Sequence, residues 1–153
     1  AVAGLTIRQS YEICDAWVVL ALRQLGIDVH HVPVNDLACG LGKIGGAAQA
    51  RRRGVVLHHA TLAYSMDPTA MAAVLRVGRE KLRDRGVPSA AKVVAPLTLQ
   101  TAKPRTEIVA AMAEEFRSRY GGTADSPTDA EREETARLVR EKYGTTAWTH
   151  EFA

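Results

Sequence analysis

The residues best suited to chemistry stand in one short run, Gly42-Lys43-Ile44-Gly45-Gly46. A lysine ammonium is a compact point charge that suits a phosphate. Glycines inside a strand give up side-chain packing, so they often mark a place where a ligand or another backbone comes close. The run therefore predicts a strand that presents Lys43 to a phosphate beside bare peptide groups. A bulge with an exposed lysine would give the same spacing, and that interpretation stays open.

Polar residues stand on both sides of this run. Asn35-Asp36 follow a proline closely, which is typical of an ordinary turn. His58 and His59 are neighbours on a predicted strand, so their side chains point to opposite faces and at most one of them lines a pocket with Lys43. The alternative for such a histidine is a buried side chain whose hydrogen bonds are satisfied within the protein.

The elements that position these residues begin with a helix. Apolar residues recur at helical spacing over residues 10–25, and a glycine ends the pattern. Residues 27–32 alternate loosely up to Pro33 and predict a strand that runs into a loop. Residues 44–51 and 55–64 predict two strands joined by a short Arg-Arg-Gly turn, which is a hairpin.

The segment after the hairpin predicts two short helices and a loop. Asp67-Pro68-Thr69 has the pattern of a helix start, with proline just inside the cap. The expected helices span residues 70–76 and 79–85, and the second ends at Gly86-Val87-Pro88. Residues 89–104 predict a loop with one extended piece.

The last third predicts two longer helices. Residues 106–120 predict an amphipathic helix capped by Thr106 and ended by a pair of glycines. Thr128 and Glu131 form a capping-box pattern for a charged surface helix to about residue 143. The residues that follow predict an extended tail laid on the body of the protein.

Size and composition limit the class of protein. The 153 residues, of which 46% are apolar, suit one ordinary domain. The apolar runs are too short for a membrane span, and the first residues lack the features of a secretory leader. Cys14 and Cys39 make no disulfide framework, and no CxxC or HxxxH spacing predicts zinc. We therefore expect a cytoplasmic protein with no membrane partner.

The charges are distributed unevenly along the chain. Residues 37–66 and 85–106 contain no acid and eight basic residues between them, whereas the net charge of the whole chain is only +3. Such windows indicate either a surface that holds an anion, for example a nucleotide phosphate, or ordinary solvated faces. The small net charge gives no reason to expect nucleic acid as a partner.

Taken in order, these motifs resemble the catalytic core of the biotin/lipoate A/B protein ligase family, and within it the lipoate–protein ligases. The resemblance rests on Asn35-Asp36, on GKIGGAAQ at residues 42–49 and on VLHHATLAY at residues 56–64. It extends over nearly the whole chain, to Trp148-Thr149-His150, and is actinobacterial in type. It implies an α+β fold, the C-terminal half of a mixed sheet packed with helices as in class II synthetases. Residues 1–120 would form that half, with residues 121–153 as a helix and tail packed on it.

The resemblance implies a reaction in two steps. ATP and lipoate give lipoyl-adenylate and pyrophosphate, and a lysine of a lipoyl acceptor domain then attacks the mixed anhydride. The lysine of the family's GK(I/V)xG strand touches the carboxylate and the α-phosphate, and Lys43 stands at that position. A fixed ammonium stabilises the charge that develops on the phosphorus-bound oxygens, so its loss is expected to cost on the order of 10²–10³ in rate.

Further site residues follow from the same resemblance. Asn35 and Asp36 match the family's ND pair, whose carboxylate would assist Mg²⁺ or nucleotide binding; the turn interpretation of this pair stays open. The backbone of Gly45-Gly46-Ala47 would lie against the adenylate. His59 and Thr61 belong to the family's HHGTL pattern and would face the lipoyl or nucleotide pocket, although this chain has alanine where the family has glycine.

The family's RRxGGG hairpin has no counterpart among the 153 residues. We therefore expect a partner that supplies the N-terminal half of the catalytic domain as a separate or cleaved chain. The other expected partner is the lipoyl acceptor domain, and the need for a further accessory domain is left open. An incomplete sheet would expose an edge and an apolar face unless a partner covers them.

Three alternatives remain at this point. Octanoyltransferase relatives use a cysteine nucleophile that would precede Asn35, where this chain has Val32-Pro33-Val34, so Cys39 is expected to be a loop thiol. A non-catalytic module could use the same fold to bind lipoate or a lipoyl domain. Arg51-Arg52-Arg53 on the hairpin turn is either solvated or guides an acidic acceptor domain.

Overall fold

The first helix begins earlier than its apolar pattern indicates. The computed structural model describes residues 2, 4–67, 69–71 and 93–150, and α1 spans Ile7–Gln24 within them. The Thr6 hydroxyl accepts from the backbone N–H of Gln9, and the Gln9 side chain accepts in return from the Thr6 N–H at 3.0 Å. This capping box adds nearly a full turn before residue 10. Gly26, with φ +79°, follows the helix as predicted.

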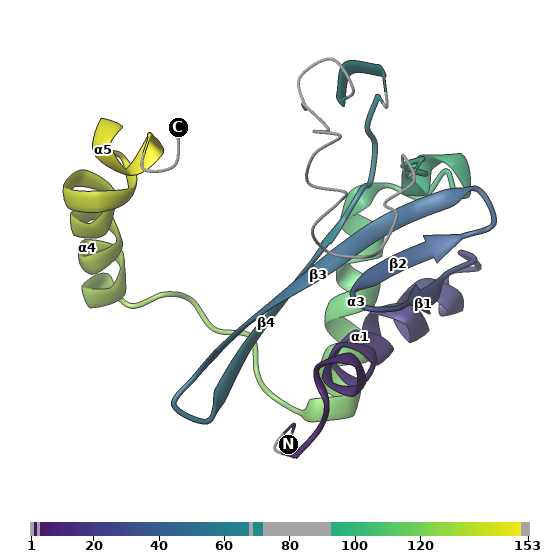
Figure 1. Cartoon of the computed structure of the whole chain (residues 1–153), viewed down its shortest axis with the longest axis horizontal. Helices are drawn as coiled ribbons and strands as arrows, with labels where there is room; N and C mark the ends of the chain where they lie inside the picture. The colour runs from purple at the N-terminus through teal and green to yellow at the C-terminus, as the bar shows by residue number, and fades with distance from the viewer. Residues whose placement is uncertain (1, 3, 68, 72–92, 151–153) are drawn as a thin grey trace, which may run out of the picture. The chain divides into compact units, whose positions relative to one another are not determined.

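Four antiparallel strands form one sheet in the order β1-β2-β3-β4 (Figure 1). They span His30–Val32 (β1), Asp36–Cys39 (β2), Gly42–Arg52 (β3) and Val55–Leu62 (β4). A parallel bridge between Lys43 and Val94 adds the extended piece predicted within residues 89–104. The α+β class is confirmed, and the pairing of the four named strands is antiparallel throughout.

The prediction that Cys39 lies in a loop was wrong, and residues 36–39 were not predicted as a strand. They form β2, a strand that pairs with both β1 and β3, and Cys39 is a buried strand residue and not a loop thiol. The sequence pattern did not indicate this strand because β2 has only four residues, between a turn pattern and two glycines. Short strands of this kind carry too little alternation to stand out.

The predicted hairpin of β3 and β4 is confirmed. Arg52 pairs with Val55, and the two residues between them have positive φ angles, +51° at Arg53 and +77° at Gly54. Positive φ at both central positions is the type I′ geometry that suits the twist of a two-residue hairpin. β4 ends at Leu62, two residues before the predicted end.

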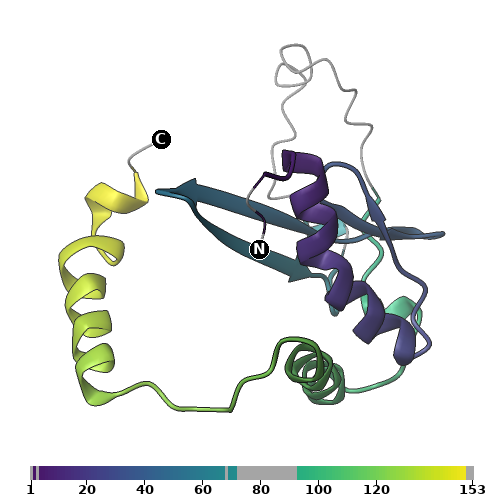
Figure 2. The ribbon, with the colours of Figure 1, turned by 90° about the horizontal axis from the view of Figure 1, so that it is seen from below.

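Two helices pack on one face of the sheet. α3 spans Arg105–Tyr120, and it contacts α1, which in turn contacts β1 and β3 (Figure 2). The helix is capped by Pro104 and not by the predicted Thr106. The buried core lies between the helices and the sheet. It contains Leu22, Val29, Leu37, Ile44, Leu97 and Ile108, and Leu97 starts the short 3₁₀ turn η2, Leu97–Leu99.

The chain divides into two units, Ala1–Gly121 and Gly122–Ala153. In the second, α4 spans Asp129–Leu138 behind the predicted capping box of Thr128 and Glu131, whose hydrogen bonds lower the pKa of Glu131. A π-helical segment, η3, continues over Val139–Tyr143. The predicted extended tail was wrong, because Thr146–Thr149 forms the short helix α5. The packing of this unit on the first stays a prediction.

Two further expectations from the sequence concern the helices after the hairpin and the absence of a membrane span. The helices expected at residues 70–76 and 79–85 lie mostly at positions 72–92, outside the described residues. Among the residues that the structure does describe, no helix is long and apolar enough to cross a membrane.

Candidate functional site

A cavity of about 430 Å³ lies on the face of the β3–β4 hairpin away from α1. Seven of the eight predicted site residues line it: Asn35, Lys43, Gly45, Gly46, Ala47, His59 and Thr61. The eighth, Asp36, lines a smaller cavity of about 210 Å³ that shares Lys43 with the first. The fold therefore brings the predicted residues together around one lysine, which was predicted to be catalytic.

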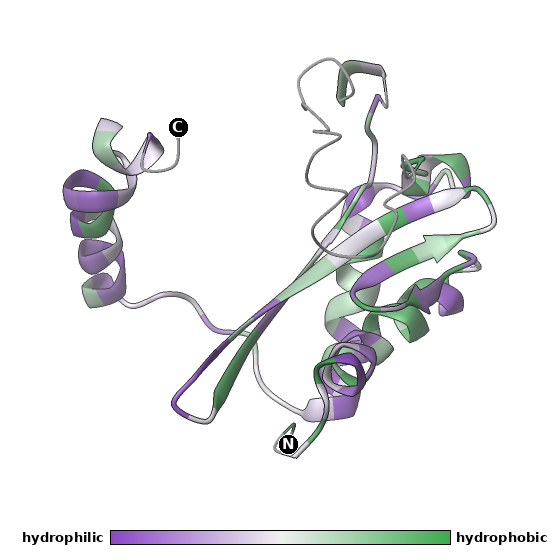
Figure 3. Ribbon diagram, viewed as in Figure 1, coloured by the Kyte–Doolittle hydropathy of each residue, from purple (hydrophilic) through white to green (hydrophobic). Residues whose placement is uncertain are grey.

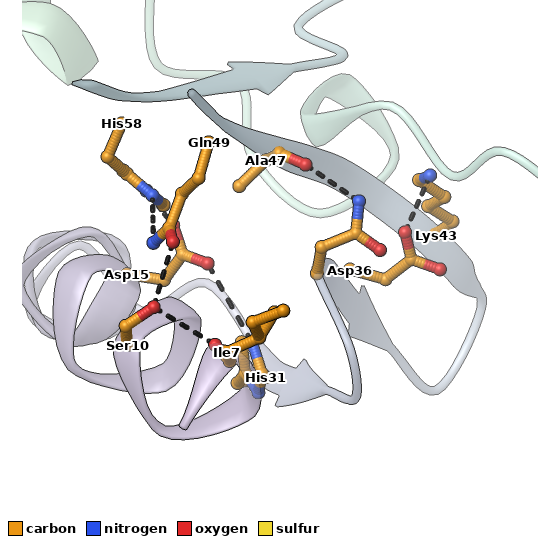
Figure 4. Close-up of polar contacts among 10 residues, drawn as sticks. Ile7, Ser10, Asp15, His31, Asp36, Lys43, Ala47, Gln49 and His58 are labelled. Atoms are coloured by element: carbon orange, nitrogen blue, oxygen red, sulfur yellow. Dashed lines mark hydrogen bonds and ion pairs between the residues drawn. The ribbon is translucent and has the colours of Figure 1, made fainter. Parts of the chain in front are cut away.

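Lys43 projects from the start of β3 and pairs with Asp36 on β2. Its Nζ lies 2.7 Å from Oδ1 of Asp36, and Figure 4 shows the two side chains pointing toward one another. The Asp36 carboxylate is buried, whereas 32% of the Lys43 side chain is exposed. One end of the pair is thus fixed in the protein, and the ammonium at the other end remains reachable from the cavity.

The backbone of Lys43 is held on both sides. Its N–H donates to the carbonyl of Val93 at 2.8 Å, and its carbonyl accepts from the N–H of Ala95 at 2.8 Å. Because Ala95 belongs to the buried core, this pairing anchors the first residues of β3. The lysine therefore starts from a rigid strand and not from a loop.

Asn35 joins the turn before β2 to the middle of β3. Its side-chain amide donates to the carbonyl of Ala47 at 2.7 Å, and its own carbonyl accepts from the N–H of Ala47 at 2.8 Å. These bonds support the turn interpretation left open in the sequence, since Asn35 fixes the backbone here. Asn35 also lines the cavity, so the two roles are compatible.

Gly45 and Gly46 are glycine for different reasons. A Cβ at Gly45 would lie 2.2 Å from the carbonyl oxygen of Thr61 on β4, which is far inside contact distance. A Cβ at Gly46 would lie 3.0 Å from Nζ of Lys43 and 3.5 Å from Oδ1 of Asp36. Gly45 thus lets β3 and β4 approach each other, and Gly46 leaves room for the Lys43–Asp36 pair.

The two neighbouring histidines face opposite sides of the sheet, as predicted. His59 lines the cavity with Lys43 and is exposed. His58 points toward α1, where its Nε2 lies 2.9 Å from Oδ1 of the fully buried Asp15 (Figure 4). The alternative of a histidine whose hydrogen bonds are satisfied within the protein therefore describes His58, which is half-buried.

A polar network surrounds His58 between α1 and the hairpin. The Oε1 atom of Gln49 accepts from Ser10 and from Arg51, so its amide nitrogen is the atom that faces Nδ1 of His58 at 3.1 Å. The amide nitrogen donates, so Nδ1 accepts and the ring hydrogen lies on Nε2, facing Asp15. Sequence reasoning missed this network. Its signal was an acid, Asp15, on the same helical stripe as buried Val18 and Leu22.

The predicted magnesium role of Asp36 finds little support in this geometry. The carboxylate is buried, and the ammonium of Lys43 already lies at hydrogen-bond distance from one of its oxygens. A divalent cation there would meet a fixed positive charge and would have to displace it. The described residues hold no group of three or more metal-ligating side chains. The Mg²⁺ role of Asp36 stays a prediction.

Comparison with known proteins places this geometry in a family. Residues 2–117 match the model of the lipoyl protein ligase A/B catalytic domain. The chain belongs to this family. Lipoate-protein ligase A subunit 1 of Thermoplasma acidophilum is 32% identical over 145 residues, which cover 86% of this chain and 55% of that protein. Octanoyltransferase LipM of Kyrpidia tusciae is 27% identical over 170 residues, covering 95% of this chain and 62% of that protein.

Solved structures of the family share the fold. A bi-partite lipoate protein ligase from T. acidophilum superposes with a TM-score of 0.76 at 30% identity, over 94% of this chain and 58% of that one. A lipoate-protein ligase A bound with ATP superposes with a TM-score of 0.73 at 27% identity, over 94% of this chain and 59% of that one. A T. acidophilum protein with bound lipoic acid superposes with a TM-score of 0.74 at 25% identity, over 97% of this chain and 61% of that one. This chain therefore spans a little over half the length of each of these five matched chains.

Proposed function

We propose that this chain forms part of a lipoate–protein ligase and contributes Lys43 to the activation of lipoate by ATP. The observation that carries the proposal is the position of the Lys43 ammonium, at the wall of the 430 Å³ cavity beside two glycines that leave the β3 backbone bare. Relatives solved with ATP and with lipoic acid make these two molecules the natural substrates to test.

In the first step, a carboxylate oxygen of lipoate attacks the α-phosphorus of ATP. The new acyl–phosphate bond forms as the bond to the β-phosphate oxygen breaks, and pyrophosphate leaves with its electron pair. Negative charge grows on the oxygens around the α-phosphorus, and the Lys43 ammonium stabilises that charge more than it stabilises the reactants. Asp36 holds the ammonium in place before the anions arrive.

In the second step, the uncharged amine of an acceptor lysine attacks the acyl carbon. An amide bond forms, AMP leaves as the bond to its phosphate oxygen breaks, and the amine loses a proton to solvent. The chain itself carries no covalent intermediate in this scheme. Lys43 and the backbone of β3 continue to hold the phosphate while the acceptor reacts.

The octanoyltransferase alternative is favoured by the LipM relative but not by the cysteines of this chain. Transfer through a thioester needs a reachable cysteine nucleophile. Cys39 is 7% exposed, and its Sγ accepts from the N–H of Leu41 at 3.3 Å. Cys14 lies on the far side of the sheet and lines a different cavity from that of Lys43. We therefore give adenylate chemistry precedence over thioester chemistry.

The proposed partners are two. One is a lipoyl domain that presents the acceptor lysine; the T. acidophilum structure combines a bi-partite ligase with its E2 lipoyl domain. The other is polypeptide that completes the catalytic domain. That relative is a precedent for a ligase of two chains, although its subunit 1 already extends beyond the matched region, because the match covers 55% of it.

Lipoate-dependent exchange of labelled pyrophosphate into ATP tests the proposal, measured on the assembly isolated from the source cells. Lys43→Ala is expected to lower the exchange rate by about 10²–10³, as for loss of a preorganised charge or donor. Lys103→Ala is the matched control, because Lys103 also pairs with a carboxylate, that of Glu107, but lies outside the cavity. Normal exchange in the Lys43→Ala assembly would exclude the proposed role.

A non-catalytic binding module gives a different result in the same preparation. Calorimetry would then detect binding of lipoate or of a lipoyl domain, while no pyrophosphate exchange and no lipoyl-adenylate would form. Binding by such a module would also be indifferent to Lys43→Ala.

A further inference from the structure

The second step of the proposed reaction releases one proton, because the attacking amine becomes an amide. A side chain that accepts this proton must line the cavity and must have a free lone pair. Among the described residues that line the cavity, two carry a titratable side chain, Lys43 and His59. The others contribute backbone, apolar side chains, the amide of Asn35 or the hydroxyl of Thr61.

Lys43 is not suited to accept the proton, because an ammonium has no lone pair. It lies 2.7 Å from Oδ1 of Asp36 and holds the phosphate in the proposed reaction. Asp36 is buried, pairs with this ammonium and lines the smaller cavity instead. The Thr61 hydroxyl donates to the carbonyl of Gly46 at 3.2 Å. Figure 3 shows a pale stretch along the middle of β3, where glycines and alanines follow one another and offer no proton acceptor.

His59 presents an uncommitted imidazole at the wall of this cavity. It is exposed, and no described residue hydrogen-bonds to its ring, whereas the ring of His58 is held by Gln49 and Asp15. A neutral imidazole presents one of its two nitrogens as an acceptor. Histidine is the side chain that most often serves as a general base. Within the described part of the cavity, His59 therefore fits the task of accepting a proton.

The register of the hairpin also places His59 at a suitable distance from the ammonium. Thr61 pairs with Gly46, and His59 pairs with Ala48, two positions further along β3. Nζ of Lys43 lies over Gly46, 3.0 Å from where a Cβ would stand. Two positions of a strand correspond to about 7 Å. This spacing leaves room for the phosphorus, oxygen and acyl carbon of an acyl phosphate between the ammonium and the imidazole.

We propose that His59 is the general base of the transfer step. As the nitrogen of the acceptor lysine bonds to the acyl carbon, the bond from that carbon to the phosphate oxygen breaks, and AMP leaves with the electron pair. The proton lost by the nitrogen passes to the His59 ring and from there to solvent. The inference rests on the proposed function, because it assumes an acyl phosphate held at Lys43. Lys43 then stabilises the phosphate in both steps, and His59 acts in the second.

Comparison of the two steps, in the assembly isolated from the source cells, tests this role. Lipoate-dependent pyrophosphate exchange measures the first step. Single-turnover transfer from synthetic lipoyl-adenylate to an unlipoylated E2 lipoyl domain measures the second. With His59→Gln, the transfer rate should fall by a factor on the order of 10² more than the exchange rate does, as for loss of a general base. His30→Gln is the matched control and should leave both rates unchanged, because His30 is an exposed strand histidine outside the cavity.

Added imidazole distinguishes a base from a residue that only shapes the cavity. His59→Ala leaves space where the ring was, so free imidazole should raise its transfer rate at least tenfold. Imidazole should not accelerate transfer by the wild type or by Thr61→Ala, which alters the same wall without removing a base. Because His59 is exposed, its substitution should change the unfolding temperature little.

Two results would overturn the inference. One is a transfer rate with His59→Gln that falls no more than the exchange rate, which would mean that the proton passes directly to solvent or to the phosphate. The other is a loss of transfer in His59→Ala that imidazole does not restore, which would assign His59 to substrate binding.

Failure of the proposed function gives a different result in the same preparations. A wild-type assembly without lipoate-dependent exchange refutes that function, while transfer from supplied lipoyl-adenylate still reports on His59. A wild type that also fails to transfer the supplied lipoyl-adenylate refutes both.

Discussion

The Lys43 ammonium and the Asp36 carboxylate meet 2.7 Å apart above Gly46, which has no side chain to separate them. Asp36 pairs with Gly46 across β2 and β3, whereas Lys43 pairs with Ala38. The lysine therefore extends along its own strand to reach the carboxylate. A single glycine makes this diagonal contact between two strands sterically possible.

A double-mutant cycle on this pair measures its contribution to folding. Lys43→Met removes the ammonium that pairs with the buried Asp36 carboxylate, so we expect a loss of about 1–3 kcal/mol in the free energy of unfolding. Asp36→Asn should cost less, because the amide remains a hydrogen-bonding group and carries no charge. The double variant should be more stable than the sum of the single effects predicts. Denaturant unfolding of the isolated chain gives all four values, and strict additivity would show that the pair is not coupled.

Gly45 and Gly46 offer a matched pair of substitutions with opposite outcomes. Gly45→Ala places a methyl group 2.2 Å from a backbone oxygen of β4, so the strands must separate and we expect a loss of about 2 kcal/mol or more. Gly46→Ala meets the end of the flexible Lys43 side chain, which can move, and its methyl group lies at an ordinary contact distance of 3.5 Å from Oδ1 of Asp36. The second variant should lose less stability than Gly45→Ala, and no more than Lys43→Met.

The Gly46→Ala variant, which is the more stable of the two, should nevertheless lose activity. Gly46→Ala displaces the Lys43 ammonium, so lipoate-dependent pyrophosphate exchange should fall by at least tenfold in a folded assembly. Equal unfolding temperatures for both variants, or normal exchange with Gly46→Ala, would contradict this assignment of roles.

The neighbouring histidines provide a second matched pair. His58→Ala leaves the fully buried Asp15 without its hydrogen-bond donor, and we expect a loss of about 1–3 kcal/mol in the free energy of unfolding. His59→Ala removes an exposed ring and should change stability by no more than about 0.5 kcal/mol. Thermal unfolding of the two variants compares them directly. A larger loss from His59→Ala would reverse the assignment of the two faces.

Cys14 should react slowly with alkylating reagents. Burial raises the pKa of its thiol, and the neighbouring Asp15 carboxylate raises it further, although Arg51 opposes the change. A raised pKa leaves less thiolate at neutral pH, so the midpoint of the iodoacetamide rate profile should lie at a higher pH than for a cysteine in an unfolded peptide. Mass spectrometry of the Cys14 peptide measures the rate. A midpoint at or below that of the peptide would contradict the expectation.

The same shift has a consequence for stability at alkaline pH. The unfolded chain loses the Cys14 proton at a lower pH than the folded chain does. The contribution of this thiol to stability is therefore complete below the unfolded pKa, and it is lost as the pH rises through the folded pKa. Denaturant unfolding of the wild type and of Cys14→Ala, repeated across that pH range, measures this. The difference in the free energy of unfolding between the two proteins should become smaller at high pH.

Sequence reasoning placed the candidate site because each of its residues left a local signal. Lys43, the two glycines and His59 stand in strands whose alternation and turn residues are readable, and the hairpin brings them together by adjacency in the chain. The opposite orientation of His58 and His59 followed from strand geometry alone. The family resemblance then supplied the roles that spacing could not decide.

What the sequence could not show depends on contacts between distant segments. The strand at residues 36–39 is defined by pairing with both neighbours and not by its own four residues. The Asp36–Lys43 pair needs the register between two strands, and the network around Asp15 needs a helix to lie over the hairpin. The helix at Thr146–Thr149 is a single turn, too short for any periodic pattern to reveal.

The hairpin turn at Arg53-Gly54 lines neither of the two cavities that Lys43 shares, yet it determines which side chains of β4 lie on each face of the hairpin. Its two left-handed residues set the alignment of β3 against β4. A slip of one position would leave either the cavity of Lys43 or the buried Asp15 without its imidazole. A connection of another length should therefore impair activity in one register and stability in the other, although the turn itself lies in neither place.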